Sequence, residues 1–170
     1  MAEDKNIPLV WIIFITNMKL PKYHLKAEKS LMVFEFTSEG TKGRIQKLVK
    51  FSETNLKGLY NLAFGDKDLE TGNINDTVIS NNGDSEKVLA TVVASLYAFM
   101  EKHPDSLVYA TGSTKARTRL YRMGITKYIT EVEKDFEVLG QRDNGWHPFK
   151  KGEEYEAFLV KRKKMRIFAV

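Results

Sequence analysis

Hydrophobic and polar residues alternate along the first half of the chain in a way that predicts strands. Apolar side chains recur at every second position in residues 31–37, 44–51 and 58–65, with mostly polar residues between them. This period of two is that of a strand with one buried face. The turn sequence SEGTKG joins the first two runs and predicts a hairpin, and the β-branched run at 76–80 adds a short fourth strand.

The pattern changes to a helical period after residue 84. Apolar residues from Val88 to Met100 recur at spacings of three and four, which predicts an amphipathic helix with Asp84 or Ser85 as its N-cap and the sequence HPDS as its end. The near-continuous apolar run at 107–112 predicts a buried strand with a parallel neighbour. A second helix is expected to begin at a Ser113 cap and to end at Gly124.

Two further strands are predicted at 135–140 and 155–163, joined by a long loop. The predicted order is therefore ββββαβαββ. It indicates an α+β fold with two helices and a mixed, mostly antiparallel sheet of about six to seven strands.

The length of the chain, 170 residues, is that of one domain. We expect a single α+β domain at 18–163, preceded by residues 1–17 as an extension or edge strand and followed by a basic tail at 164–170. The apolar run at 9–15 is too short to span a membrane. Acidic residues precede it and no small-residue cleavage site follows it, which argues against a signal peptide, so we predict a cytoplasmic protein that does not bind membranes.

The residue types of the chain exclude several classes of site. There is no cysteine, which excludes disulfides, thiolate nucleophiles and cysteine-bound zinc. The three histidines have no ligand spacing, and the acidic stretch at 66–77 lacks the glycine and the closing glutamate of a calcium loop. No metal site is predicted.

Charge is distributed unevenly along the chain, whose net charge is +5. Acidic residues predominate from 53 to 86, whereas the second predicted helix and residues 161–166 are basic. Such asymmetry indicates an anionic partner for the basic part, or attraction between the two parts of the chain.

The second predicted helix carries its basic residues on one surface. On a helical wheel Lys115, Arg119 and Arg122 fall within about 60° of one another. The opposite stripe, which we expect to face the sheet, consists of Ala116, Leu120 and Met123. Arg117 and Tyr121 lie on a flank between the two.

This basic helix is the main candidate site. Its predicted anion-binding residues are Ser113, Lys115, Arg117, Arg119 and Arg122. Such a stripe can grip the phosphates of a nucleic acid or the carboxylates of an acidic protein, and Tyr121 beside it can stack on a base. The alternative is a solvated helix face that pairs with acidic residues further along, namely Glu131, Glu133 or Asp135.

Two other segments are weaker candidates. The loop with Asn82, Gly83 and Ser85 enters a helix N-terminus, which favours anions, although Asp84 already supplies a negative charge there and ordinary capping explains the sequence as well. Trp146 and Phe149 in the last loop either form a binding surface or pack over the end of the sheet.

Several stretches carry a resemblance to a known family. They are YHLKAEKSLMVFEFTSEG, VKFSETNLKGLYNLAFGDKD, SNNGDSEKVLATV and YATGSTKARTRLYRMGI, which span roughly Lys22 to Lys163. In these the chain resembles a family of proteins of unknown function from Bacteroidota. The resemblance implies no activity, and it leaves residues 1–17 outside.

The predicted order of elements is similar, more distantly, to the later core of the GCN5-related N-acetyltransferases. That resemblance implies an acetyltransferase-like core that binds acetyl-CoA, with Asn82, Gly83 and Ser85 at the pyrophosphate and Tyr121 as general acid. Ser113, Ala116 and Gly124 fit the spacing of that superfamily's closing motif, whereas Tyr121 stands one residue late.

Three functions therefore stay open. The first is a binding protein that presents a basic helix to an anionic partner and needs no cofactor. The second is an acyltransferase, and the third is an interaction partner of the kind found in toxin–antitoxin operons, docked through residues 1–17.

Overall fold

In the computed structural model, which describes residues 21–75, 77–78 and 80–164, the chain forms eight strands and two helices. The strands are β1 (Lys26–Ala27), β2 (Val33–Gly40), β3 (Gly43–Glu53), β4 (Leu59–Asp66), β5 (Leu107–Ala110), β6 (Phe136–Arg142), β7 (Gly145–Pro148) and β8 (Ala157–Arg162). The helices are α2 (Ser85–Lys102) and α3 (Lys115–Val132). The predicted α+β class with two helices and mainly antiparallel strands is confirmed, although there are more strands than the six to seven expected.

The chain divides into two compact units. Unit 1 comprises the described residues up to Ser52 together with Asn61–His103, and unit 2 comprises Glu53–Tyr60 together with the described residues from Pro104 onward. Each unit is described by itself below.

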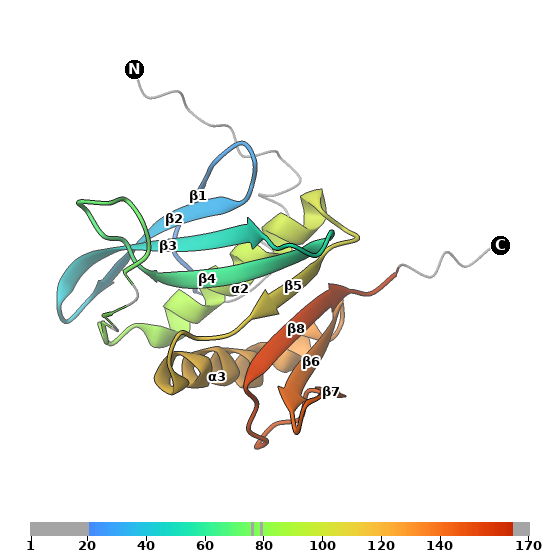
Figure 1. Cartoon of the computed structure of the whole chain (residues 1–170). Coiled ribbons are helices and arrows are strands. Elements are labelled where there is room, and N and C mark those ends of the chain that lie inside the picture. The colour runs from blue at the N-terminus through green and yellow to red at the C-terminus, as the bar shows by residue number, and fades with distance from the viewer. Residues whose placement is uncertain (1–20, 76, 79, 165–170) are drawn as a thin grey trace. The chain divides into compact units, whose positions relative to one another are not determined.

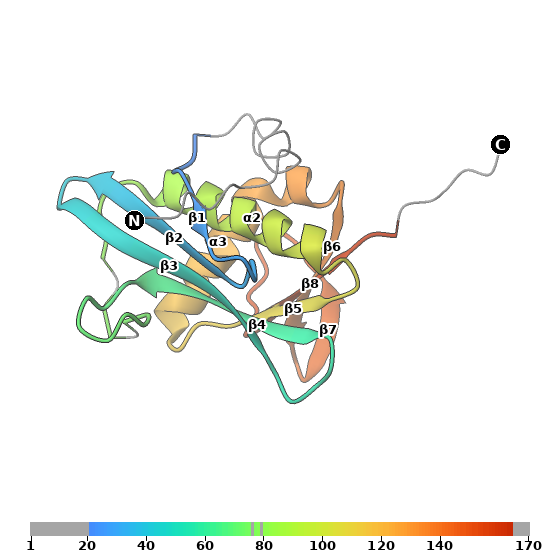
Figure 2. The same cartoon turned by 90° about the horizontal axis from the view of Figure 1, so that it is seen from above.

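Unit 1 consists of neighbouring strands β1-β2-β3-β4 and helix α2. β2 and β3 form the predicted hairpin, paired from Val33↔Lys50 to Gly40↔Gly43. Helix α2 lies along one face of these strands (Figures 1 and 2). Its Phe99 stacks on Phe51 of β3 with ring centroids 4.2 Å apart, and both rings are fully buried. The alternating apolar residues of the sequence thus supply one side of this core and the helical repeat supplies the other.

Unit 2 contains the strand order β5-β8-β6-β7. Strand β8 lies between β5 and β6 and is antiparallel to both, with Val160 opposite Val108 on one side and Val138 on the other. These three valines are buried, and α3 runs beside these strands (Figure 1). The described pairing of β5 is thus an antiparallel one with β8.

The long loop predicted after residue 140 contains a hairpin instead. β6 and β7 pair from Leu139↔Pro148 to Arg142↔Gly145. Asp143 and Asn144 between them have φ of 51° and 59°. Positive φ at both central residues is the geometry of a two-residue hairpin turn, and Asp and Asn tolerate it better than most residues. The sequence RDNG carried this signal, which the prediction of a loop overlooked.

Helix α3 differs from its prediction in length and in rotation. Thr114 rather than Ser113 is its N-cap, and it passes Gly124 and ends at Val132. Its buried stripe contains Arg117, Tyr121, Gly124, Tyr128, Ile129 and Val132, whereas Met123 of the predicted apolar stripe is 49% exposed and Ala116 is exposed too. The prediction was wrong because it ended the helix at Gly124. It therefore left out Tyr128, Ile129 and Val132, the apolar residues that determine which face of the helix is buried.

Some predictions fall outside the described residues. These are the extension at 1–17, residues 165–170 of the basic tail, and Asp76 and Ile79 of the strand predicted at 76–80. The described residues of that segment, Thr77, Val78 and Ser80, belong to no strand. Within the described chain, neither helix has the length and hydropathy that crossing a membrane requires.

Candidate functional site: a cationic hollow in unit 2

The site begins at the turn that leads from β5 into α3, residues 111–114. Gly112 allows this turn to pass close to the helix, since a Cβ atom there would lie 2.3 Å from the amide nitrogen of Thr118. That is far inside van der Waals contact with backbone, so no other residue fits without moving the turn. The Gly112 amide donates to Thr118 Oγ1 over 3.1 Å, which ties the turn to the first turn of the helix.

The hydroxyl groups of the turn cap the helix. Thr114 Oγ1 accepts from the Arg117 amide at 3.2 Å, and the Thr118 hydroxyl donates back to the Thr114 carbonyl at 3.2 Å. The Thr111 hydroxyl donates to the Glu156 carbonyl at 2.9 Å and so fixes the turn to the segment before β8. The helix therefore starts from a rigid turn, with the positive end of its dipole directed at the space in front of it.

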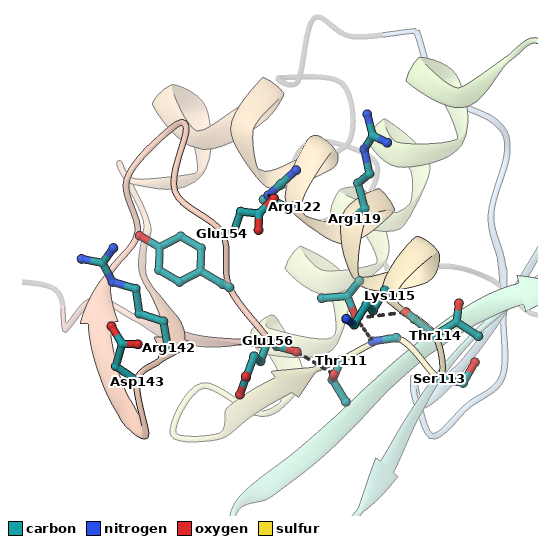
Figure 3. Close-up of a pocket in the computed structure, with 13 residues that line it drawn as sticks. Thr111, Ser113, Thr114, Lys115, Arg119, Arg122, Arg142, Asp143, Glu154 and Glu156 are labelled. Carbon is teal, nitrogen blue, oxygen red and sulfur yellow. Dashed lines mark hydrogen bonds and ion pairs between the residues drawn. The ribbon is translucent and has the colours of Figure 1, made fainter.

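A hollow of about 640 Å³ lies in front of this turn (Figure 3). We call it the cationic hollow. Its lining comprises Thr111, Gly112, Ser113, Thr114, Lys115, Thr118, Arg119, Arg122, Arg142, Asp143, Glu154, Tyr155 and Glu156. Of the predicted anion-binding residues, Ser113, Lys115, Arg119 and Arg122 are brought together on this lining.

Two of the four cations that line the hollow are paired. Arg122 Nη1 lies 3.3 Å from Glu154 Oε1, and Arg142 pairs with Glu153. The other two, Lys115 and Arg119, are exposed and form no ion pair within the part of the chain that the structure describes. The sequence left open that the basic helix pairs with acidic residues at its far end. Arg122 pairs with Glu154 instead, and Glu131 at that end pairs with Lys134.

The wall opposite α3 carries charges of both signs. It is formed by Arg142, Asp143 and the segment from Glu154 to Glu156 (Figure 3). Tyr155 holds this segment in place, since it is buried and packs where a Cβ on Gly140 would lie 2.2 Å from its ring. The hollow therefore has a cationic wall on α3 and a mixed wall facing it.

Two predicted residues are not part of the hollow. Arg117 and Tyr121 are buried in α3, 8% and 9% exposed, and neither lines the hollow. Arg117 therefore takes no part in the surface on which Lys115, Arg119 and Arg122 meet. A role for Tyr121 as a general acid stays a prediction.

The second candidate loop lies in unit 1, and its polar groups are hydrogen-bonded to neighbouring parts of the fold. The side chain of Asn82 is buried, donates to Ser38 Oγ and the Gly43 carbonyl at 3.0 Å each, and accepts from the Lys42 amide at 2.7 Å. Gly83 has φ of 76°, and its amide donates to Asn81 Oδ1 at 3.2 Å. These bonds hold the loop against the β2–β3 hairpin.

Asp84 at the start of α2 is used in the same way. It occupies the N-cap position, but its side chain makes no capping hydrogen bond. Its Oδ2 instead accepts from the hydroxyls of Tyr23 and Ser38, at 2.6 Å each. Burial, and then the hydrogen bond to Asp84, raise the pKa of Tyr23 above its ordinary value.

Several residues of the hollow were not predicted from the sequence. Thr111, Thr118, Arg142 and the acidic side chains at 143, 154 and 156 come from three separate segments, 111–118, 142–143 and 154–156. Only tertiary structure brings these segments together, although Gly112 before a helix cap was a local signal of a close approach. No group of three histidine, aspartate or glutamate side chains among the described residues is placed to hold a metal ion.

The model of a family of unknown function (DUF6934) matches residues 19–163. No curated protein and no solved structure matches the chain.

Proposed function

The chain belongs to this family of unknown function, and we propose from the geometry of the cationic hollow that it is a binding protein for the phosphates of a nucleic acid. The observation that carries the proposal is the pair of exposed cations without ion-pair partners, Lys115 and Arg119, at the N-terminus of an 18-residue helix. Protein surfaces usually intersperse charges of opposite sign. Unpaired cations gathered at the positive end of a helix dipole raise the local potential for anions.

The turn below these cations suits a compact anion. Ser113 is exposed and lines the hollow, and its hydroxyl makes no hydrogen bond to the described residues. The hydroxyl is thus available as a donor. It lies beside the amides of the first helical turn, of which the Arg117 amide is used by the Thr114 cap. A phosphate seated there meets a hydroxyl, helix amides and two cations.

The acidic residues of the hollow oppose the binding of an anion, and Glu154 makes this opposition testable. Glu154 is 90% exposed on its side chain while it pairs with Arg122. Exposed ion pairs contribute about 0–1 kcal/mol, so an incoming phosphate can replace this carboxylate at little cost. Glu154 therefore competes with the ligand for Arg122, and its removal strengthens binding.

The test is a titration of a fluorescein-labelled single-stranded RNA of about 12 residues, followed by anisotropy between about 50 and 200 mM salt. We expect affinity to fall as salt rises. Lys115→Ala with Arg119→Ala weakens binding and makes the log–log salt slope shallower by about 1.4, which is about 0.7 for each lost contact to a single strand.

Two further variants make the test specific. Lys50→Ala with Lys57→Ala removes the same charge from exposed positions outside the hollow and should leave the slope unchanged. Glu154→Gln should tighten binding. If the Lys115 and Arg119 variant behaves like the Lys50 and Lys57 variant, the proposal is wrong.

An acyltransferase is the second candidate, and one observation favours it. The loop with Gly83 at φ 76° leads into the 18-residue helix α2, and such helix N-termini bind phosphates in many proteins. The carboxylate of Asp84 stands at that N-terminus and would repel a pyrophosphate. Under our proposal saturating acetyl-CoA leaves the melting temperature unchanged, whereas a rise of several degrees would favour the acyltransferase.

A further inference from the structure

We propose that the nucleic acid is single-stranded and that one of its bases stacks on Trp146 while its phosphates occupy the cationic hollow. This inference rests on the proposed function and names the class of nucleic acid that the site selects. It follows from an aromatic pair that includes Trp146, which the sequence predicted either to form a binding surface or to pack over the end of the sheet.

The pair consists of Trp146 on β7 and Tyr109 on β5. Their rings meet edge to face, with centroids 6.1 Å apart and an interplanar angle of 79°. Trp146 is 39% exposed, and Tyr109 is half-buried. In an edge-to-face pair at least one ring keeps a face that its partner does not cover, so a third ring can stack there.

The two rings lie on the outer face of the unit 2 strands. In the strand register Tyr109 is opposite Leu159 and Leu159 is opposite Leu139, and Trp146 pairs with Gln141, two residues after Leu139, so all four side chains share this face. Both leucines are half-buried. The result is an apolar platform that is open to solvent.

The platform and the hollow lie at the same end of the unit 2 strands, on opposite faces. Trp146 pairs with Gln141, one position from the Gly145↔Arg142 pair, so its side chain and that of Arg142, which lines the hollow, point to opposite faces of the hairpin. Tyr109 is two residues before Thr111, which also lines the hollow. Two residues of strand span about 7 Å, so a short oligonucleotide that passes over this end of the strands can occupy both.

The charges of the two walls set the direction of the ligand. Lys115, Arg119 and Arg122 lie on the α3 wall, whereas Asp143 lies on the facing wall (Figure 3). Asp143 belongs to the β6–β7 turn, three residues before Trp146. A phosphate is attracted to the first wall and repelled by the second. The backbone therefore lies along α3, and the base, which carries no charge, extends toward the turn and the platform.

Stacking on a protein ring requires an accessible base face, and this distinguishes a single strand from a duplex. In a duplex the faces of the bases are covered by their neighbours, while in a single strand they are available to aromatic side chains. An acidic protein has the charge for the hollow but no base for the platform. The platform is thus the feature that selects among polyanions.

Tryptophan fluorescence gives a direct test. The chain has one other tryptophan, Trp11, so Trp11→Phe leaves Trp146 as the sole tryptophan, which is excited selectively over the tyrosines at long wavelength. This variant is titrated with an oligodeoxythymidylate of about eight residues, with a hairpin duplex whose paired stem is stable at the temperature of the titration, and with inorganic polyphosphate. We expect quenching by the single strand, and little or none by the duplex or by polyphosphate.

A binding measurement separates stacking from charge. Trp146→Leu should weaken single-strand binding about 10-fold, within the range for the loss of one base–aromatic stack, and leave polyphosphate affinity unchanged. Tyr109→Phe, which keeps the ring, should change neither. Circular dichroism of each variant establishes that it is folded.

The outcomes distinguish this inference from the function on which it rests. If the single strand and polyphosphate both bind but Trp146→Leu affects neither, or if the duplex binds as tightly as the single strand, the platform does not hold a base and the inference is overturned. If none of the three polyanions binds, the proposed function fails as well.

Discussion

The polar side chains of the two units differ in whether their partners lie within the fold. In unit 1 the polar groups inside the fold bind one another, as in the Asp84 carboxylate with Tyr23 and Ser38, or the Asn82 amide with three partners. In unit 2 the polar groups around the turn before α3 cap the helix, and the cations beyond them, Lys115 and Arg119, are left exposed.

Lys47 shows the same contrast for a charged residue. It is buried at 6% exposure in unit 1, where its ammonium donates to Asp66 and to Ser80, the latter at 2.7 Å. The Ser80 hydroxyl completes the cluster by donating to Asp66 at 2.9 Å. A buried charge must be satisfied within the fold, whereas an exposed charge without a partner is available to a ligand. Under the proposed function, the polar groups of unit 1 contribute to stability and the exposed cations of unit 2 contribute to binding, and four variants test that division.

The largest effect is expected from Asp66→Ala. It leaves the Lys47 ammonium buried with only Ser80 as a described partner, so the free energy of unfolding should fall by about 3–5 kcal/mol. Urea denaturation measures it. Lys47→Met with Asp66→Leu should recover most of the loss, because a well-packed apolar pair can replace a buried ion pair. A loss below about 1 kcal/mol for Asp66→Ala would mean that the pair is solvated.

Gly40→Ala should come next. A Cβ at this position would lie 1.8 Å from the carbonyl oxygen of Asn82, which also accepts from the Thr41 amide at 3.0 Å. The loop must move off the hairpin, and we expect a loss of about 1–3 kcal/mol. Gly43→Ala is not a matched control because Gly43 has φ of 88°, whereas Thr37→Ala changes the same strand without such a clash. Equal melting temperatures for Gly40→Ala and Thr37→Ala would contradict the prediction.

Tyr23→Phe should have a smaller, pH-dependent effect. The fold raises the Tyr23 pKa, first by burial and then through Asp84, so the contribution of the protonated phenol is complete below its ordinary pKa of 10.0 and is lost as pH rises through the higher folded value. Removal of the hydroxyl should cost about 1 kcal/mol at neutral pH. The difference from the wild type should shrink above pH 10.0. A difference that stays constant up to about pH 11 would show that Tyr23 does not titrate in this range.

The smallest effect on stability is expected from Lys115→Ala with Arg119→Ala. Because both side chains are exposed and neither has an ion-pair partner among the described residues, the free energy of unfolding should change by less than about 0.5 kcal/mol. Thermal denaturation of the same protein used for RNA titration measures it. A large loss in the free energy of unfolding would mean that these cations stabilise the fold, and the contrast between the two units would then be wrong.

Much of the fold could be predicted from the sequence because its patterns are local. The period of two around Phe34 and Phe51 and the helical repeat that ends in Met100 each place apolar residues on one face, and burial of those faces settles the element. Lys47 stands in the same inward register as Val49 and Phe51, but a lysine there gives no hint of Asp66 and Ser80, which come from distant segments.

The candidate site was predictable only in part for the same reason. Lys115, Arg119 and Arg122 follow from helical spacing alone, whereas Arg142 and Glu154 join them through the pairing of β6, β7 and β8. Arg117 was placed on the surface because charge normally stays in water, and tertiary packing of α3 overrode that preference. Short-range patterns thus identified the cationic wall but not the wall that faces it.

Gly112 turns this geometry into a criterion for comparing relatives. The turn can pass this close to the helix only where the residue has no Cβ, and the residues of this turn line the hollow. In a relative with a bulkier residue at this position the turn must move, and we expect the hollow to change shape even if every lysine and arginine is kept. A relative with glycine there and different charges would keep the cavity but exchange its ligand. The residue at this position therefore indicates whether a relative keeps the cavity, and the charges around it indicate which ligand the cavity binds. A count of basic residues does not distinguish these two properties.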